Sequence, residues 1–391
     1  MIIDRKTSLA LGLILCSSSA ICATKVADGR GNGMGNTGVA SADYLVAPFY
    51  NPALGAFYRE SDDIAILVPA VGITGRDTDE TLDTLDDFQD LYDKDKFDES
   101  TASKETVDQL NGYLNDLTGN SPLTVTGGVG LAVAVPSEHV SVNVFGRGFV
   151  EIIASTRVAA LGSYDPNNQV DYATKTKTRI ESSEVDLVAF GYSEFGIAFA
   201  KLFEYNGHNF SLGLSPKYQE LKTYSDTVNV DDFDLDDYDK SETSKSAFNM
   251  DLGAIWYKGA WRVGLSVKDI FKQEIDTTAG NYKYELSPQA TAAVAYNTRF
   301  FTAAIDADLT KQTRYTKIKD DTQFIRFGIE GNAWDWLQLR AGYEIDAQDT
   351  LDNSVTAGLG LSPFDVLNID LAGSYAGDNQ FGGSANLAFT F

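Results

Sequence analysis

Cysteine is nearly absent from the sequence. The 391 residues contain two cysteines, Cys16 and Cys22, and both lie close to the N-terminus. If that region is removed during export, the mature chain has no thiol, which excludes disulfides, redox pairs and cysteine metal sites.

Long apolar runs are also missing, because no stretch approaches the roughly 20 apolar residues of a membrane-spanning helix. The best candidate, residues 9–16, is too short. It follows two basic residues and leads into small residues that end at Ala23, which is the order of a secretory signal peptide. We expect residues 1–23 to be a signal peptide, with cleavage after Cys22 as the alternative to cleavage after Ala23.

Histidine is rare, and the sequence offers little for catalysis. His139 and His208 are the only histidines, and both fall at predicted tight turns, so we expect no catalytic residue, no cofactor and no enzymatic activity. The acidic run at residues 231–239 supplies oxygen ligands, but it lacks the glycine and the terminal glutamate of a calcium loop. We therefore expect a solvated loop and no specific metal site, with loose binding of divalent ions as the alternative.

Alternation of apolar and polar residues runs through most of the chain from about residue 64. In residues 301–310, for example, Phe301 and Ile305 belong to one face and Asp306 and Asp308 to the other. Side chains of a strand alternate between the two faces of a sheet, so this pattern predicts strands with one apolar and one polar face. About 14 strands are expected, near residues 62–75, 122–135, 139–163, 183–203, 208–224, 244–257, 260–270, 284–296, 299–311, 321–331, 335–346, 352–361, 365–376 and 381–391.

The connections between these strands are sorted by length. Short turns, such as those at residues 204–207 and 257–260, alternate with longer polar connections, such as residues 76–121 and 225–243. Together with an even strand count, this alternation is typical of an outer-membrane barrel with tight periplasmic turns and longer external loops. The sequence therefore predicts an all-β protein, a transmembrane antiparallel β-barrel at residues 62–391.

Charge and aromatic residues follow the same division. Residues 76–121 hold 14 acidic and 4 basic residues, and residues 225–243 hold 8 acidic and 1 basic, so these external loops carry -17 of the formal net charge of -25. In the first loop, apolar residues recur at helical spacing near residues 82–92 and 107–117, which predicts two amphipathic helices over the external mouth. The tryptophans flank two short turns, as expected for an aromatic girdle at the periplasmic interface of the outer membrane. They are Trp256, Trp261, Trp334 and Trp336.

The segment that precedes the first strand has neither helical nor strand periodicity. Residues 28–56 hold five glycines within ten positions and an asparagine-proline-alanine turn, which allow or force irregular backbone. Apolar side chains such as Met34, Tyr44 and Phe49 require a packing surface. We therefore expect a fixed segment that packs inside the barrel.

Within this segment, residues 34–41 (MGNTGVAS) and 47–54 (APFYNPAL) resemble the start of the conjugal transfer protein TraF family, which is encoded in plasmid transfer operons. More distantly, the glycine-rich start and 14 strands resemble FadL-type barrels for hydrophobic compounds and PorV-type secretion barrels. The resemblance covers essentially the whole mature chain. It implies that residues 24–61 plug the lumen as a hatch and that the aromatic C-terminal Phe391 is recognised by the barrel-assembly machinery. The hatch residues that carry the resemblance are Met34, Gly35, Gly38, Asn51, Pro52 and Ala53.

Charged residues on the polar strand faces should point into the lumen. An arginine or lysine on the lipid side costs up to about 2–4 kcal/mol at the membrane midplane. The lumen charges expected are Asp306, Arg326, Glu330, Arg340 and Glu344, together with Asp251, Arg262, Lys268, Asp308 and Asp370. They either pair across the lumen and anchor the hatch, or form a charged constriction in a transport path. Pro216 and Pro288 fall inside predicted strands, where each would remove a ladder hydrogen bond; a lateral exit and a tolerated kink are both open there.

Two functions follow for a protein of the cell outer membrane, in contact with lipid and lipopolysaccharide and without a role for nucleic acid. The first is passive passage of small hydrophobic molecules. The second is a non-transporting envelope component, a docking platform for other envelope proteins in conjugation or secretion. A continuous apolar cavity from lid to hatch would favour passage, whereas a lumen filled by paired charges would favour docking.

Overall fold

The protein is described by a computed structural model that covers residues 27–92, 97–233, 241–278, 282–315, 320–333, 336–363 and 366–391. The expected signal peptide at residues 1–23 lies outside these described residues. So do Trp334 and most of the acidic run at residues 231–239.

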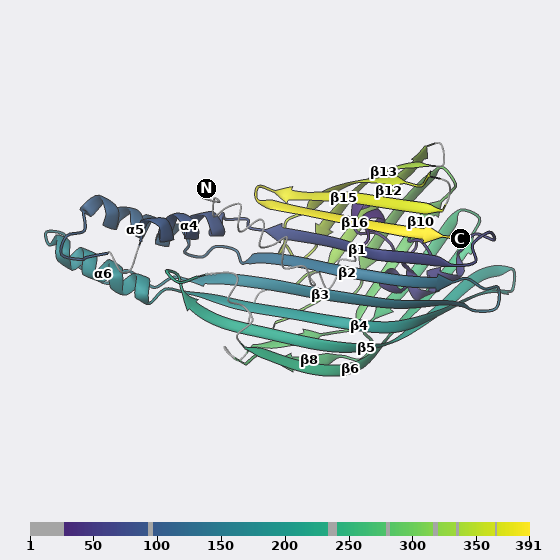
Figure 1. Cartoon of the computed structure of the whole chain (residues 1–391), viewed down its shortest axis with the longest axis horizontal. Coiled ribbons are helices and arrows are strands. Elements are labelled where there is room, and N and C mark those ends of the chain that lie inside the picture. The colour runs from purple at the N-terminus through teal and green to yellow at the C-terminus, as the bar shows by residue number, and fades with distance from the viewer. Residues whose placement is uncertain are drawn as a thin grey trace.

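Fourteen antiparallel strands close into a barrel, in which the last strand pairs with the first (Figure 1). In chain order they are β1 (Ala65–Arg76), β2 (Leu123–Val135), β3 (Ser141–Arg157), β4 (Glu184–Tyr205), β5 (His208–Asn229), β6 (Glu242–Lys258), β7 (Trp261–Lys268), β10 (Gln289–Asn297), β11 (Phe301–Asp308), β12 (Phe324–Ala333), β13 (Leu337–Asp346), β14 (Ser354–Leu361), β15 (Leu367–Gly377) and β16 (Gln380–Thr390). The predicted fold class and the number of barrel strands are confirmed.

The two faces of the wall differ as the alternation predicts. On β4, Phe195, Ile197 and Phe199 are exposed on the outside, whereas Glu194 and Ala198, at alternate positions, are buried on the inside. The neighbouring strand β5 repeats the pattern with exposed leucines. The outer face is therefore apolar, and the inner face holds most of the charged side chains. Within the described residues, no helix is long and apolar enough to cross a membrane.

One predicted strand differs from the structure. Residues 284–296 are divided at Pro288: β9 (Lys283–Leu286) pairs with β8 (Gln273–Asp276) in a separate two-stranded sheet, and the barrel strand β10 begins after the proline. Placing Pro288 inside a barrel strand was therefore wrong, because a residue without N–H marks the start of the strand instead. Pro216 does lie within β5, and the pairing of β5 with β4 is interrupted beside it, between Gly196 and Phe199.

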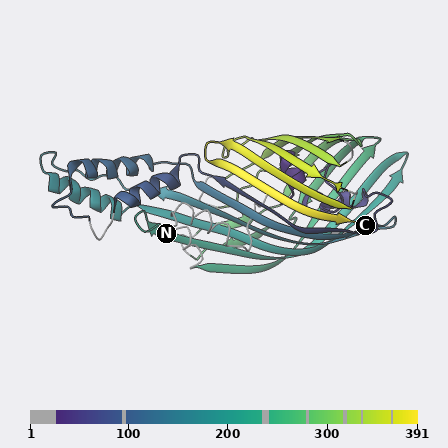
Figure 2. The ribbon, with the colours of Figure 1, turned by 45° about the horizontal axis from the view of Figure 1, so that its top comes forward.

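Three helices extend from the end of the barrel that carries the longer connections. The predicted helices of the first loop are confirmed as α4 (Thr81–Leu91) and α5 (Lys104–Asp116), and a third helix that was not predicted, α6 (Gln169–Glu181), joins them. In both views the helices run past the ends of β2 and β3 along the long direction of the barrel (Figures 1 and 2). The predicted position across the mouth is therefore wrong, and we call α4, α5 and α6 the helical arm.

The helical arm has its own core. Leu85 and Phe88 of α4 pack with Leu110 and Leu114 of α5 and with Ile180 of α6, and the cluster continues onto buried residues at the ends of the adjoining strands. The amphipathic spacing of each helix thus finds its partner in the other helices. The arm is consequently joined to the taller side of the wall. The strands β4 and β5 on that side are 22 residues long, whereas β7, elsewhere in the wall, has only 8 residues.

The N-terminal segment lies inside the barrel, drawn in purple in Figure 1. It consists of α2 (Gly29–Gly33), α3 (Ala47–Tyr50) and the 3-10 helix η1 (Pro52–Ala56) with irregular connections. Its apolar side chains share one buried cluster with inward-facing residues of the wall. The described tryptophans occupy the opposite end from the arm, beside short turns, and Trp261 and Trp336 are 52% and 49% exposed.

Candidate functional site

The N-terminal segment begins with a short helix whose first turn is held by Asp28. The Asp28 carboxylate accepts hydrogen bonds from the backbone N–H groups of Arg30 and Gly31 at 3.3 and 2.9 Å. From α3, the Tyr50 hydroxyl donates to the same carboxylate at 3.2 Å. Burial, and then the nearby Asp370 carboxylate, raise the pKa of Asp28. One buried carboxyl therefore caps α2 and joins it to α3.

Two consecutive residues in the left-handed region turn the chain after α2. Gly35 and Asn36 have φ angles of 66° and 62°, which glycine and asparagine tolerate better than other residues. The turn allows Gly35 N–H to donate to Thr356 Oγ1 on β14 at 2.8 Å and the Asn36 amide to donate to Glu344 on β13 at 3.1 Å. It therefore presents hydrogen-bond donors to the wall.

The Asn51 side chain organises the second half of the segment. Its Oδ1 accepts from Ala53 N–H at 3.1 Å, and its Nδ2 donates to the Val39 carbonyl at 2.9 Å. Pro52 occupies the first position of η1, where a missing N–H removes no helical hydrogen bond. Asn51, Ala53 and Met34 have no exposed surface, so the predicted hatch residues lie in the interior of the barrel.

Glycines of the wall provide the surface on which this segment rests. A Cβ atom added to Gly342 would overlap the backbone N of Gly35, and one added to Gly213 would overlap the backbone N of Ala53. The wall glycines in such contact with the N-terminal segment are Gly213, Gly253, Gly264, Gly328, Gly342 and Gly358. None of them is among the residues predicted from the sequence, although a glycine inside a strand is a signal for close approach of another backbone.

Wall carboxylates complete the attachment. Asp306 of β11 is 1% exposed, and its Oδ2 accepts from the backbone N–H groups of Gly38 and Val39 at 2.8 and 2.9 Å. Bonds between a carboxylate and backbone N–H groups are charge-assisted, and they are roughly twice as strong as neutral ones. The glycine at position 38 allows this approach, because the Tyr50 ring occupies the space of a Cβ there.

Glu330 of β12 is shared by two arginines. Arg30 of the N-terminal segment donates to both of its oxygens, at 2.9 and 2.8 Å, and a third Arg30 nitrogen donates to the Ser41 carbonyl at 2.6 Å. Arg340 of β13 donates to Glu330 at 2.7 Å and to Asp370 at 2.6 Å. Buried charges are stable only when they are paired in this way. The network links the segment to three strands of the wall.

Three more of the predicted lumen charges, Arg326, Asp308 and Glu344, form a second group of ion pairs beside this network. Arg326 donates to Asp308 at 2.9 Å and to Glu344 at 3.0 Å, and Glu344 also accepts from Asn36. Thus five of the predicted lumen charges, Asp306, Arg326, Glu330, Arg340 and Glu344, are buried inside the barrel. Asp306, Glu330 and Glu344 bind the N-terminal segment, whereas Arg326 and Arg340 donate to carboxylates of the wall.

A second ionic cluster, around Lys217, lies on the other side of the lumen. Lys217 is 1% exposed, and its Nζ is 2.8 Å from Asp269, 2.9 Å from Asp251 and 3.3 Å from Glu194. Glu194 also pairs with Arg147 at 2.9 Å. Of these residues only Asp251 was predicted, since the cluster assembles from four strands and one connection that no sequence pattern relates.

Apolar side chains line the lumen along β3 and β4. We call this surface the apolar strip; it consists of Phe145, Phe149, Ile153, Val188, Phe190 and Tyr192, all buried on inward-facing positions. At one end of the strip the Phe49 ring of the N-terminal segment meets Phe145 edge-on, with ring centroids 6.2 Å apart. The rest is covered by residues of β8, β9 and Tyr315.

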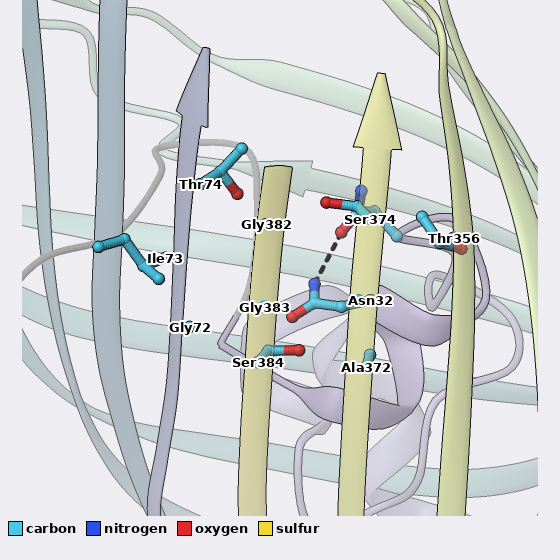
Figure 3. Close-up of a pocket in the computed structure, with 12 residues that line it drawn as sticks. Asn32, Gly72, Ile73, Thr74, Thr356, Ala372, Ser374, Gly382, Gly383 and Ser384 are labelled. Atoms are coloured by element: carbon cyan, nitrogen blue, oxygen red, sulfur yellow. Dashed lines mark hydrogen bonds between the residues drawn. The ribbon is translucent and has the colours of Figure 1, made fainter. Parts of the chain in front are cut away.

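A small cavity of about 30 Å³ separates α2 from β1 and β14 to β16 (Figure 3). It is lined by small and polar residues, among them Asn32, Thr74, Ser374 and Ser384. Its volume suits one or two water molecules, so it is too small and too polar for an apolar ligand. The lumen is therefore mixed: paired charges lie on both sides of it, and on β3 and β4 the apolar strip is interspersed with Arg147, Glu151 and Glu194.

Among the remaining predicted residues, Lys268 of β7 donates to the Phe49 carbonyl of the N-terminal segment at 2.6 Å, whereas Phe391 and the two histidines lie outside the lumen. Phe391 is 56% exposed, and its backbone pairs with Ile64 on the first strand side of the barrel seam. His139 and His208 are exposed at two short turns, and His208 accepts from the Trp256 indole at 3.4 Å. Neither histidine belongs to the ionic clusters described above.

Comparisons with known proteins agree with this architecture. Residues 48–308 match the family model described as "F plasmid transfer operon, TraF, protein". The toluene transporter TodX of Pseudomonas putida superposes with a TM-score of 0.51 at 10% identity, covering 95% of this chain and 99% of that chain. The monoaromatic hydrocarbon channel CymD gives a TM-score of 0.55 at 12% identity, with the same coverage. At these identities the likeness is one of fold. No curated protein sequence matches the chain.

Proposed function

The chain belongs to the TraF family of F plasmid transfer operon proteins, and we propose that it is an outer-membrane barrel that admits small apolar molecules past a displaceable hatch. The hatch is the N-terminal segment at residues 27–61. The proposal includes membership of the outer membrane, since the exposed outer face is apolar and pairs with a charged interior.

The apolar strip is the observation that carries this proposal. A barrel that serves only as a scaffold can fill its lumen with ion pairs, as this chain does near Arg326 and Arg340. Inward-facing aromatic rings on β3 and β4 instead provide the kind of surface that lines small-molecule sites. The solved structures of similar fold are named as a toluene transporter and a monoaromatic hydrocarbon channel, which supports the same class of passenger.

The hatch can close the lumen and still be displaced without disrupting the barrel. The hatch contacts the wall through side chains, glycine surfaces and ion pairs, and it contributes no strand to the barrel ladder. Its removal would therefore break no strand pairing. In the described conformation the barrel is shut, and passage requires the hatch to move.

A reversible disulfide tests this requirement. A Cβ added to Gly55 of η1 would lie 3.3 Å from the Cβ of Ala200 on β4, close to the separation of about 3.8 Å found in disulfides. Because the mature chain is expected to lack cysteine, the G55C/A200C pair would be the only thiols present. We expect the oxidised pair to abolish uptake of the apolar dye phenylnaphthylamine by cells that carry the protein, and reduction to restore it.

The single variants G55C and A200C are the matched controls, since each makes the same local change without a crosslink. A variant that lacks residues 29–56 should take up the dye constitutively and conduct ions in a planar bilayer. If oxidised, reduced and deleted forms all exclude the dye while the barrel is folded, passage through the lumen is ruled out.

The helical arm favours a second function, that of a docking platform in the cell envelope. Its helices present exposed acidic side chains such as Asp83 and Asp87 around a separate core, and the family description places its members in a plasmid transfer operon. Replacing residues 77–122 by a short turn would test it. Loss of plasmid transfer with dye uptake unchanged would support docking, and unchanged transfer would exclude it.

A further inference from the structure

A hairpin of the chain enters the lumen from the side of the longer connections. β8 and β9 form a two-stranded sheet that is separate from the barrel ladder, and Tyr284 of β9 also bridges to Tyr315. We call β8, β9 and Tyr315 the inner insertion. Its apolar residues Ile275, Tyr284 and Leu286 are 4%, 1% and 7% exposed, although they belong to a connection between two barrel strands.

The inner insertion covers the apolar strip with aromatic rings. The Tyr284 ring lies flat against the Phe190 ring of β4, with centroids 3.4 Å apart and planes inclined by 7°. The Tyr315 ring meets the Tyr284 ring edge-on, with ring centroids 5.1 Å apart. Behind Phe190, the rings of Phe149 and Tyr192 lie at 5.8 and 6.1 Å. Tyr284 therefore fills a slot with a flat floor and a perpendicular side wall.

Polar contacts attach the insertion to the wall, among them the buried ion pair between Arg314, the neighbour of Tyr315, and Glu151 of β3. Thr223 of β5 donates to the Asp276 carbonyl at 3.0 Å, Lys245 of β6 donates to the Glu274 carbonyl at 2.9 Å, and Thr243 shares a hydrogen bond with Thr278. An isolated two-stranded hairpin is marginally stable in water. Packing on the apolar strip therefore adds to these polar contacts in holding the hairpin in this position.

We propose that the slot between Phe190 and Tyr315 is a binding site for a planar aromatic molecule, and that Tyr284 occupies it in the absence of that ligand. A flat apolar ring would gain the stacking and edge contacts that Tyr284 makes now. By replacing that ring it would release the inner insertion from the lumen. The proposal rests on the passage of apolar molecules and names their class and their outer gate.

Binding of naphthalene to the purified full-length protein in amphipol tests the site. Equilibrium dialysis with radiolabelled naphthalene should give tighter binding to Tyr284→Ala than to the native protein by about tenfold or more, because the competing ring is gone. Adding Phe190→Ala to Tyr284→Ala should abolish that gain, since the floor of the slot is lost. Asp276→Ala, at an exposed position on β8 where only the backbone carbonyl bonds the wall, should bind as the native protein does.

Two comparisons distinguish binding in a shaped slot from nonspecific hydrophobic binding. Decalin has the carbon skeleton of naphthalene but is not planar, so an excess of it should compete poorly. A disulfide between T243C and T278C, whose native hydroxyl oxygens are 2.9 Å apart, should hold the insertion in place. Oxidation should then reduce naphthalene binding by about tenfold or more, and reduction should restore it; each single cysteine variant is the control.

The outcomes distinguish this site from the proposed function. Equal naphthalene binding by native protein, Tyr284→Ala and the double variant, each confirmed as a folded barrel by its heat-dependent gel mobility, overturns the site. Equal competition by decalin also overturns it. Tight, planar-selective binding with no dye uptake in any hatch variant supports the site and overturns passage through the lumen.

Discussion

At the residue scale, the most specific feature of this chain is the fit of wall glycines against the hatch backbone. Gly328 and Gly331 lie on the same strand, β12, yet a Cβ on Gly328 would overlap Met34, whereas one on Gly331 would have nothing within 4 Å. The two positions therefore separate the effect of the hatch contact from the effect of alanine in a strand.

We expect Gly328→Ala to loosen the hatch and leave the barrel folded. Limited proteolysis of the purified protein should cleave residues 28–56 about tenfold faster or more, which corresponds to a loss of about 1.4 kcal/mol in docking free energy. Gly331→Ala should behave as the native protein. Equal cleavage of the two variants would mean that the wall glycines do not determine hatch position.

Hatch docking should also depend on pH through Asp28. Burial raises the pKa of Asp28 above its ordinary value of 3.8 in the docked state. The docked carboxyl therefore holds its proton more tightly than the released one, so this group favours docking at low pH and loses that contribution as pH rises through the docked pKa. Hydrogen exchange of the hatch should accelerate over this range, and Asp28→Asn should flatten the dependence. Replacing the exposed Asp116 by asparagine should leave it unchanged.

At the element scale, the arm illustrates what periodicity detects and what it misses. α4 and α5 carry leucines at helical spacing and were predicted. The buried face of α6 includes Thr176 and Arg179, and Arg179 is satisfied by Asn111 Oδ1 at 2.9 Å and Asn115 Oδ1 at 2.9 Å. Polar residues at core positions hide a helix from an apolar pattern, because their partners, such as Asn111 of α5 and the Ala159 carbonyl, become neighbours only in the folded protein.

The arm should unfold independently of the barrel. Leu114 has no exposed surface, and truncating a buried leucine costs about 2–5 kcal/mol. We expect Leu114→Ala to remove hydrogen-exchange protection from α4, α5 and α6 while the strands stay protected. Gln109→Ala, an exposed position on α5, is the matched control. Loss of protection in the strands as well would show that arm and barrel form one cooperative unit.

At the scale of the whole molecule, the closure of the barrel joins the first and last strands. Phe391 donates its N–H to the Ile64 carbonyl at 2.8 Å, and its own carbonyl accepts from Asp63 and Ile64. Its ring is exposed, and we propose that the assembly machinery recognises it. Backbone closure and ring recognition can therefore be separated by substitution.

We expect Phe391→Ala to lower the folded yield in the outer membrane by about tenfold or more, because the aromatic ring is lost. Phe391→Tyr should retain the yield, because the ring is kept. Both variants keep the backbone pairing, so a difference between them reports on the ring. The measurement is the folded fraction of membrane-inserted protein on unheated gels. Refolding of the same variants into detergent, without the assembly machinery, should be equal. A parallel loss in detergent would assign the effect to barrel stability and not to recognition.

The barrel could be predicted from the order of the residues alone. Alternation along each strand and the sorting of short and long connections suffice to place 14 strands, because both are local consequences of a wall with one apolar and one polar face. They also indicated that charges such as Arg326 and Glu330 point inward, since the lipid side does not tolerate them.

The filling of the lumen, in contrast, depends on contacts that form when the chain folds. The Lys217 cluster, the wall glycines and the inner insertion bring together residues from separate strands and loops, and no periodicity relates these positions. Whether an inward ring such as Phe190 faces water, the hatch or Tyr284 depends on how a loop folds back across the wall. That is a property of packing between distant segments, so it could be seen only once the barrel had closed around them.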